Sequence, residues 1–466
     1  MKDLMVVVLD VGKTMAKASL WDAAGRLVRR VVRPNARGLP VEYPALDAAG
    51  IEVWFGEVLK QFASLGRIGA IIPVAHGAAA AIVRDGALAA PPMDYEYEPS
   101  PADREAYHRQ RDAFSHTGSP AMGLALNLGQ QLHCLEAMRP DLLTGDAMIL
   151  PWPQYWAWVL SGVAASEVTS LGSHTDLWSP ARCGASDMAV RRGWAARLAP
   201  LRKASEALGP ISRAWAKRTG LPDDVQVYVG LHDSNAALYA ARGFPEIADQ
   251  DATVISTGTW FVSMRSLGSG SAFDLRTLPD DRNCLVNVDT EGRPAPTALF
   301  MGGREIELLG GAGIDAPERQ NPMMAAIQTV VSQDMAVTPT MAPGTGPFPH
   351  GRGGWTRAAA DASESGAAIA LYAALMCDVG LDLIGANGPV LIDGRFGRCD
   401  PFTRALASLR PHARVFIGGE ESDVSFGALR VVRPHLRPNL ELKEVSPLGQ
   451  DLNSYRSMWR DRISAS

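Results

Sequence analysis

The sequence predicts an α/β protein composed of two domains of similar design. Its length of 466 residues is about three times that of a typical single domain. Apolar runs of strand length alternate with helical segments, and the arrangement of strand, short turn and strand at the N-terminus recurs after residue 242. We therefore expect an N-terminal domain at residues 1–243 and a C-terminal domain at residues 244–466, joined near Gly243-Phe244-Pro245.

The first domain is expected to begin with a β-meander. Residues Leu4–Leu9 form a continuous β-rich run, which is typical of a strand buried on both faces. A turn at Asp10–Thr14 leads to a second strand at Ala16–Asp22, and a third strand follows at Leu27–Val32. Because no helix separates these strands, a dinucleotide-binding βαβ unit is not expected here.

The remaining elements are predicted from apolar periodicity and from glycine and proline positions. In the first domain we expect helices at Val53–Ser64, Gly129–Met138 and Tyr155–Leu160, basic helical segments from about Ser186 to Ala199, and strands at Ile68–Val74 and Val225–Val229. In the second domain we expect strands at Ala252–Ser256, Trp260–Met264 and Val390–Gly394, and a long Ala-rich helix at Ala359–Leu383. An aromatic cluster is expected in the core or at a packing edge, with sugar stacking as the alternative; its members are Trp152, Tyr155, Trp156 and Trp158.

The composition restricts the classes of function. Basic residues number 45 against 50 acidic residues, so we expect no nucleic-acid partner. No apolar run approaches the roughly 20 residues of a membrane-spanning helix, and no signal-peptide cleavage site follows the first strand. From the missing cleavage site and the missing membrane-spanning run we expect a cytoplasmic protein without a membrane partner. The five cysteines are scattered without a CxxC pair, which predicts reduced thiols rather than a disulfide framework or a zinc site. The acidic stretch Gly419–Asp423 is interpreted as a solvated turn rather than a metal site.

The first candidate for chemistry is the turn after the first strand. Gly12 permits close approach of the backbone to phosphate oxygens, while Lys13 and Thr14 supply a cation and a hydroxyl group. Asp10, at the end of the strand, could hold Mg²⁺ through water. The alternative is a plain hairpin with a capping aspartate.

A similar turn in the second domain is the next candidate. Thr257, Gly258 and Thr259 follow a predicted strand, as the first turn does. One such hairpin in each domain could hold the phosphates of a nucleotide from two sides. Two unrelated turns are the alternative interpretation.

The third candidate is the pair His232-Asp233. Asp233 follows a predicted strand and precedes a run of small residues in which a helix is expected to begin. A helix N-terminus favours the carboxylate form, which suits a base that accepts a hydroxyl proton during phosphoryl transfer. An ordinary helix N-cap is the alternative role.

Taken together, these segments resemble the FGGY carbohydrate kinases, members of the superfamily that includes actin and heat-shock chaperones. The resemblance covers nearly the whole chain and is carried by two phosphate motifs, a stretch that leads to a catalytic aspartate, and an adenosine-site region. The corresponding residues are Asp10-x-Gly12-x-Thr14-x-x-Lys17, Ser256–Trp260, Gly209–Asp233, Gly394–Gly397 and Ser425–Ala428. Glu167-Val168-Thr169 also lies at a family-like position.

The resemblance implies two actin-like, ribonuclease H-like domains with mixed sheets flanked by helices and an active site in the interdomain cleft. It implies ATP and Mg²⁺ as cofactors, Asp233 as the catalytic base, and Asp10 with Asp233 near the metal. The residues assigned to the nucleotide are Gly12, Lys13, Thr14, Lys17, Thr257, Gly258, Thr259, Gly302, Gly394 and Arg395. Those assigned to the sugar are His76, Gly77, Asp94, His232 and Asp233.

Within the family, the His232-Asp233 pair is most similar to rhamnulokinase and fuculokinase. The implied reaction is ATP-dependent phosphorylation of a primary hydroxyl of a small ketose such as L-rhamnulose or L-fuculose, by a monomer or homodimer. We expect His232 and Gly77 to face the sugar from opposite sides of one pocket. The alternatives are a kinase for xylulose, ribulose, erythritol or glycerol, an actin-like or chaperone-like nucleotide switch, and a sugar-binding regulator without catalysis. Gly394-Arg395 departs from the two or three adjacent glycines common in the family.

Overall fold

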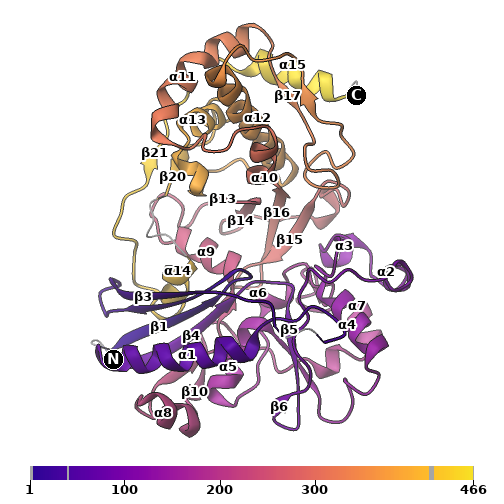
Figure 1. Ribbon diagram of the computed structural model, residues 1–466, viewed down its shortest axis with the longest axis vertical. Helices are drawn as coiled ribbons and strands as arrows, with labels where there is room; N and C mark the ends of the chain where they lie inside the picture. Colours follow the sequence, from indigo (N-terminus) through magenta and orange to yellow (C-terminus); the bar gives the residue numbers. More distant parts are fainter. Residues whose placement is uncertain (1–3, 39–40, 419–423, 465–466) are drawn as a thin grey trace. The chain divides into compact units, whose positions relative to one another are not determined.

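The computed structural model describes residues 4–38, 41–418 and 424–464 (Figure 1). The chain divides into two compact units, and each contains a mixed sheet with helices. The first unit comprises Met1–Gly243, Val286–Pro294 and Asp423–Arg437. The second comprises Phe244–Leu285, Ala295–Ser422 and Pro438–Ser466. The α/β fold class is confirmed, and the two later segments that return to the first unit were not predicted.

The first unit begins with the predicted meander. Strands β1 (Met5–Val11), β2 (Met15–Trp21) and β3 (Leu27–Pro34) pair antiparallel in sequence order. Alternate residues of β1 enter two different cores, with Val7 and Leu9 in one and neighbouring Val6 and Val8 in the other. This burial on both faces explains why β1 reads as a continuous apolar run.

A crossover helix carries the chain to the centre of the same sheet. Helix α1 (Ala48–Ala63) leads to β4 (Ile68–Ala75), which lies parallel to β1. The helix begins five residues before the predicted start at Val53, because the side chain of Asp47 accepts a hydrogen bond from Gly50 N at 2.9 Å and caps it.

The far side of β4 receives two short parallel strands. Strands β11 (Gln226–Tyr228) and β12 (Leu231–His232) both pair with β4, and helix α9 (Asp233–Ala241) begins directly after β12. Helix α14 (Val424–Val432) packs closely on α9, where a Cβ at Gly427 would lie 1.8 Å from Ala236 O. This close helix contact is one physical reason why the segment around α14 belongs to the first unit.

The aromatic cluster lies in the core, as predicted. Helix α5 (Trp152–Ser161) buries Trp152, Tyr155 and Trp156, and Trp152 stacks on Tyr155 with ring centroids 5.2 Å apart. The helical segments predicted from about Ser186 to Ala199 are α7 (Asp187–Arg191) and a 3₁₀ turn at Ala195–Arg197, which are separated where the chain turns at Gly193 with a φ of 72°.

The remaining elements of the first unit are short strands and helices around these sheets. They are β5 (Ala80–Arg84), β6 (Ala87–Leu88), α2 (Pro101–His108), α3 (Phe114–Thr117), α4 (Leu128–Met138), β7 (Met148–Pro151), α6 (Val168–Leu171), β8 (Trp178–Ser179), β9 (Gly184–Ala185), β10 (Ala207–Pro210) and α8 (Arg213–Thr219).

The second unit repeats the hairpin and crossover arrangement. Strands β13 (Ala252–Thr257) and β14 (Phe261–Ser266) form an antiparallel hairpin, and β14 also pairs antiparallel with β16 (Pro294–Phe300). On its other side β13 pairs in parallel with β19 (Val390–Gly394), which pairs in parallel with β20 (Val415–Ile417). Strand β15 (Cys284–Val288) begins in this unit and continues into the segment that belongs to the first unit. The other elements are α10 (Gly302–Leu308), α11 (Pro317–Ser332), β17 (Val337–Thr338), β18 (Gly354–Trp355), α13 (Asp400–Leu409), β21 (Lys443–Glu444), α15 (Asn453–Ser464) and 3₁₀ turns at Leu275–Thr277 and Arg395–Arg398.

Helix α12 (Ala362–Leu383) is the predicted Ala-rich helix. Its 22 residues are long and apolar enough to cross a membrane by length and composition, and 89% of the apolar window is buried inside the protein. The expectation that no apolar run approaches that length is therefore wrong. A buried core helix has the same composition, because all of its faces contact apolar neighbours.

Candidate active site

Three parallel strands of the first unit end at the same level. Val11, at the end of β1, lies opposite Ala75 of β4, and His232, at the end of β12, lies opposite the same residue. Since the carboxyl ends of neighbouring parallel strands meet at one edge of a sheet, the residues that follow them share that edge. These residues are Gly12, His76 and Asp233.

Asp233 is held through one of its carboxylate oxygens. Its Oδ1 accepts hydrogen bonds from Ser234 N at 2.6 Å and Ser234 Oγ at 3.3 Å, and His232 Nε2 lies 3.3 Å from the same atom. Among the described residues none forms a hydrogen bond with Oδ2, and 27% of the side chain is exposed. Burial raises the pKa of the Asp233 carboxyl, an effect partly offset by His76 and the bonds from Ser234. A base with such a pKa binds a proton more readily than an ordinary aspartate.

The imidazole of His232 is buried, and each of its two ring nitrogens has a hydrogen-bonding neighbour. Its Nδ1 lies 3.3 Å from Asn235 Nδ2, and its Nε2 lies 3.3 Å from Ser173 Oγ. Because the Asn235 amide donates to Nδ1, the ring proton lies on Nε2, from which it can be donated to Asp233. Burial lowers the pKa of His232 to about 4, so the ring is neutral at physiological pH.

His76 and Gly77 follow the central strand. His76 Nδ1 donates to Gly77 O at 2.7 Å, and its ring meets that of Tyr95 edge-on with centroids 5.7 Å apart. A Cβ at Gly77 would lie 2.9 Å from His232 Nε2. The expectation that Gly77 and His232 lie across a pocket from each other is therefore corrected, because the imidazole occupies the space that the glycine leaves.

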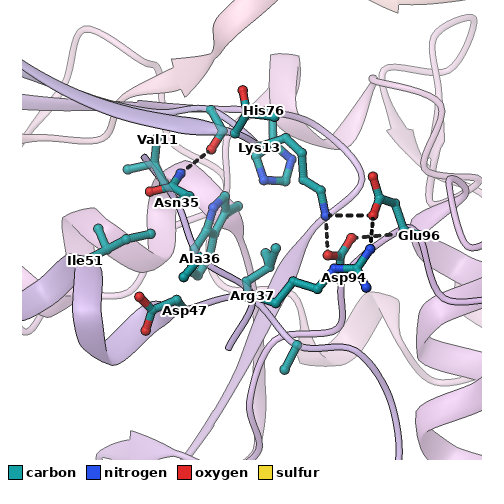
Figure 2. A pocket seen from close by; sticks show the side chains of 15 residues that line it. Val11, Lys13, Asn35, Ala36, Arg37, Asp47, Ile51, His76, Asp94 and Glu96 are labelled. Atoms are coloured by element: carbon teal, nitrogen blue, oxygen red, sulfur yellow. Dashed lines mark hydrogen bonds and ion pairs between the residues drawn. The ribbon is translucent and has the colours of Figure 1, made fainter. Parts of the chain in front are cut away.

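A polar cavity of about 220 Å³ extends from this edge of the sheet. Figure 2 shows the side chain of Lys13 reaching Asp94 and Glu96, and the side chain of Arg37 reaching the same Glu96. Lys13 is ion-paired with Asp94 and lies 3.7 Å from Glu96 Oε2, while Arg37 Nη2 lies 3.0 Å from the same oxygen. Lys13 Nζ also lies 4.9 Å from the centroid of the Tyr95 ring. The cation assigned to phosphate from the sequence thus contacts the predicted sugar loop in this structure.

Asp10 lies in β1 of the first hairpin, opposite Lys17 of β2. Its side chain is 9% exposed, and Lys17 Nζ lies 3.6 Å from Asp10 Oδ2. Lys17 also lowers the pKa of Asp233 through its charge, which places its ammonium group near both proposed metal-site carboxylates. The described residues contain no group of three or more His, Cys, Asp or Glu side chains arranged to hold a metal ion.

In the second unit, several predicted nucleotide residues gather at the hairpin of β13 and β14. Thr257 Oγ1 donates to Asp393 O at 2.6 Å and accepts from Phe396 N at 3.0 Å, which ties the hairpin to the turn after β19. Gly394 has a φ of 88°, and a Cβ there would lie 2.4 Å from Thr257 O. Gly258 and Thr259 are exposed at the tip of the hairpin.

Two other predicted nucleotide residues have packing contacts of their own. A Cβ at Gly302 would lie 2.5 Å from the ring of Phe261, so this glycine allows α10 to approach the hairpin. Arg395 forms a bidentate ion pair with Asp315, with nitrogen–oxygen distances of 2.9 and 2.7 Å. The acidic stretch Gly419–Asp423 lies outside the residues that the structure describes.

Sequence reasoning missed Ser173, Asn235, Arg37 and Asp315 as members of these clusters. Ser173 contacts a histidine 59 positions later, and Asp315 contacts an arginine 80 positions later. No short motif joins such residues, so only the folded chain brings them together. Asn235 carried a signal, because it lies one helical turn after His232.

Comparisons with known proteins bear on the family and the fold. A family model for the C-terminal domain of FGGY carbohydrate kinases matches residues 249–439. A carbohydrate kinase structure from Novosphingobium aromaticivorans is 48% identical and covers 100% of both chains with a TM-score of 0.96. The structure of xylulose kinase from Rhodospirillum rubrum, at 18% identity, covers 99% of this chain and 98% of its own with a TM-score of 0.81, which supports the fold alone.

The curated L-fuculokinase of Escherichia coli K12 is 25% identical over 277 residues. This alignment spans 57% of the present chain and 57% of the relative, slightly more than half of each. Over its full length and at 48% identity, the chain is similar to a carbohydrate kinase. The chain belongs to the FGGY carbohydrate kinase family.

Proposed function

We propose that the protein transfers the γ-phosphoryl group of ATP to a primary hydroxyl of a small, uncharged sugar, with Asp233 as the base. The observation that carries this proposal is the environment of Asp233. Its Oδ1 is held by Ser234, its Oδ2 is available, and burial raises its pKa. A carboxylate of this kind is suited to accept a hydroxyl proton as phosphoryl transfer begins.

In the proposed reaction the sugar hydroxyl gives its proton to Asp233 Oδ2. The hydroxyl oxygen forms a bond to the γ-phosphorus as the bond to the bridging oxygen breaks, and ADP leaves with that oxygen. The proton on Asp233 then passes to solvent. His232, neutral and adjacent, can donate from Nε2 without adding a charge beside the base.

The two glycine-containing hairpins are the proposed phosphate sites, one in each unit. Gly12 and Thr14 supply backbone and hydroxyl donors in the first, with Lys17 close to the same edge. Thr257, Gly258 and Thr259 supply them in the second, and Gly302, Gly394 and Arg395 shape the surroundings of that hairpin. Donors in such hairpins would stabilise charge that develops on the phosphoryl oxygens.

Mg²⁺ is the proposed companion of ATP. Because the described residues contain no ready-made cluster of metal ligands, they fit an ion held mainly by phosphate and water, as Mg²⁺ commonly is. Asp10 and Asp233 are the carboxylates placed to contact its water ligands. When bound, the ion would offset negative charge on the β- and γ-phosphates.

The proposed substrate is a neutral ketose, most simply a deoxyketose such as L-fuculose or L-rhamnulose. Among the described residues that line the cavity, Lys13 and Arg37 are each paired with a carboxylate, and burial lowers the pKa of His76. A sugar acid would need an unpaired cation, whereas a neutral sugar needs only donors and acceptors. The curated relatives are L-fuculokinases, which supports the same class. We propose a cytoplasmic monomer or homodimer.

A coupled assay of ADP release over a panel of sugars tests this function. The panel contains L-fuculose, L-rhamnulose, both enantiomers of xylulose and ribulose, erythritol, glycerol and gluconate. We expect a neutral ketose to give the highest kcat/KM. Preference for gluconate would contradict the neutral-sugar assignment, and ADP release that no sugar stimulates would favour a nucleotide switch instead.

The matched variants are Asp233→Asn and Asp224→Asn. Asp233→Asn should lower kcat by roughly 10²–10⁴-fold, the range for a positioned general base. Asp224 is 61% exposed in an ion pair with Arg67, so its loss should leave turnover unchanged. Turnover of Asp233→Asn within a few-fold of wild type would exclude Asp233 as the base.

A further inference from the structure

A buried carboxyl group lies directly before helix α6 (Val168–Leu171), in the first unit. Glu167 caps this helix, and its Oε2 accepts hydrogen bonds from Thr169 N at 3.0 Å, Thr169 Oγ1 at 2.6 Å and Ser170 N at 3.2 Å. The side chain is fully buried, and Oε1 has no hydrogen-bond partner among the described residues. Helix α6 has only four residues. Capping so short a helix contributes little stability compared with the free-energy cost of burying a carboxyl group.

The hydroxyl of Thr169 connects this carboxyl group to the proposed base. Thr169 Oγ1 accepts a hydrogen bond from His232 N at 3.0 Å. A hydroxyl has a single proton, and the Thr169 proton is directed to Glu167 Oε2. The oxygen lone pairs of Thr169 are thereby turned toward the backbone of His232, the residue that precedes Asp233.

The same segment also contacts the imidazole. Ser173, four residues after Thr169, lies 3.3 Å from His232 Nε2. Residues 167–173 therefore hold both the backbone nitrogen and the ring of His232. The residue before this segment is anchored through both of its backbone groups, since Ser166 N donates to Pro200 O and Arg202 N donates to Ser166 O, both at 2.9 Å.

We propose that Glu167 and Thr169 are positioning residues for the phosphoryl transfer, acting through the backbone of His232 to fix Asp233 at the end of β12. This inference rests on the proposed role of Asp233 as the base. Neither residue is assigned a contact with the sugar or the nucleotide. Their contribution is geometric, and a displacement of about 1 Å at a reacting group can lower a rate by roughly 10²-fold.

The test compares Thr169→Val, Thr169→Ser and Ser170→Ala in the full-length protein. Valine has nearly the shape of threonine but cannot accept from His232 N or donate to Glu167, so kcat should fall roughly 10–100-fold. Serine keeps the hydroxyl group and should retain kcat within about threefold. Ser170 Oγ contacts Glu167 at 3.4 Å and has no bond to His232, so Ser170→Ala is the matched control and should behave like wild type.

The KM for ATP distinguishes positioning from a general structural defect. We expect Thr169→Val to leave the KM for ATP within about twofold of the wild-type value. A damaged fold would instead change the KM values for both ATP and the sugar, and it would lower the thermal unfolding temperature. If Thr169→Val does not fold, Glu167→Gln provides the second measurement, because the amide oxygen can still accept from Thr169. Glu167→Gln should retain most of the wild-type kcat, whereas Glu167→Ala should lower kcat to the same extent as Thr169→Val.

Asp233→Asn is measured in the same assay so that the two proposals can fail separately. Wild-type kcat in Thr169→Val, together with loss of turnover in Asp233→Asn, would overturn the positioning role alone. Retained turnover in Asp233→Asn would overturn the proposed base and the positioning role that depends on it. Equal losses in Thr169→Ser and Thr169→Val would also contradict the positioning role, since serine preserves the hydrogen bond.

Discussion

The ammonium group of Lys13 forms an ion pair with the carboxylate of Asp94, and this pair joins the hairpin after β1 to a loop 81 residues later. The Lys13 side chain is 18% exposed and that of Asp94 is 2% exposed, so the pair is largely removed from water. Glu96 N donates to Asp94 Oδ1 at 2.9 Å, which fixes the other side of the carboxylate. The residue that sequence reasoning assigned to phosphate thus organises the wall of the polar cavity (Figure 2).

Lys13→Met should therefore affect the sugar more than ATP. The change leaves Asp94 buried without its cation, and we expect the free energy of unfolding to fall by about 3 kcal/mol. The KM for the sugar should rise roughly tenfold as the loop loses its anchor, while the KM for ATP changes little. Chemical denaturation and steady-state kinetics measure these two effects.

Lys60→Met is the control for the loss of a lysine. Lys60 pairs with Glu57 at 2.9 Å on the exposed face of α1, so its replacement should alter neither KM value. A higher KM for ATP in Lys13→Met, with the KM for the sugar unchanged, would instead indicate that Lys13 binds the phosphates of ATP.

Gly77→Ala should disturb the imidazole of His232. The added Cβ would lie 2.9 Å from both His232 Nε2 and Ser173 Oγ, closer than ordinary contacts allow. We expect a kcat/KM for the sugar at least tenfold lower. Gly123→Ala is the control, because nothing lies within 4 Å of the corresponding Cβ. Normal kinetics in Gly77→Ala would show that the histidine can move without consequence.

Gly258→Ala tests close approach of the nucleotide to the second hairpin. The nearest atom to a Cβ at this position is Trp260 O at 3.8 Å, so the protein itself has room for the methyl group. A rise of about tenfold in the Kd for ATP, with an unchanged unfolding temperature, would thus report a ligand contact. Calorimetric titration with ATP measures the Kd, and an unchanged Kd would remove Gly258 from the phosphate site.

Glu167 should make stability depend on pH. Burial raises the pKa of Glu167 from 4.5 to about 7 in the folded protein, although the hydrogen bonds from Thr169 and Ser170 oppose this shift. Between these two pH values the folded state binds more protons than the unfolded state. The contribution of Glu167 to stability therefore declines by about 3 kcal/mol as the pH rises from 4.5 to 7.

Glu167→Gln removes this titration. Unfolding free energies of wild type and Glu167→Gln, measured in urea at several pH values, should therefore diverge as the pH rises, with the variant gaining relative stability. Parallel pH profiles for the two proteins would show that the carboxyl group has an ordinary pKa.

The sequence by itself determined the local elements and the positions of the main polar candidates. The run Leu4–Leu9 predicted β1, the Gly and Thr turns predicted the hairpins, and the small residues after Asp233 predicted the start of α9. Apolar periodicity and turn residues report on interactions between neighbours in the chain, so these features required no tertiary information. The helical segments from about Ser186 to Ala199 were predicted, but the turn at Gly193 that separates them was not.

Only the tertiary structure decided which polar side chains meet. The parallel register that places Val11 and His232 opposite Ala75 brings three strand ends together from positions far apart in the chain. It is this assembly that pairs Lys13 with Asp94, packs His232 against Gly77 and directs Thr169 to His232 N. Burying a charge or a hydrogen-bonding group costs free energy unless it finds a partner, and the choice of partner depends on distances that exist only after the strands have aligned.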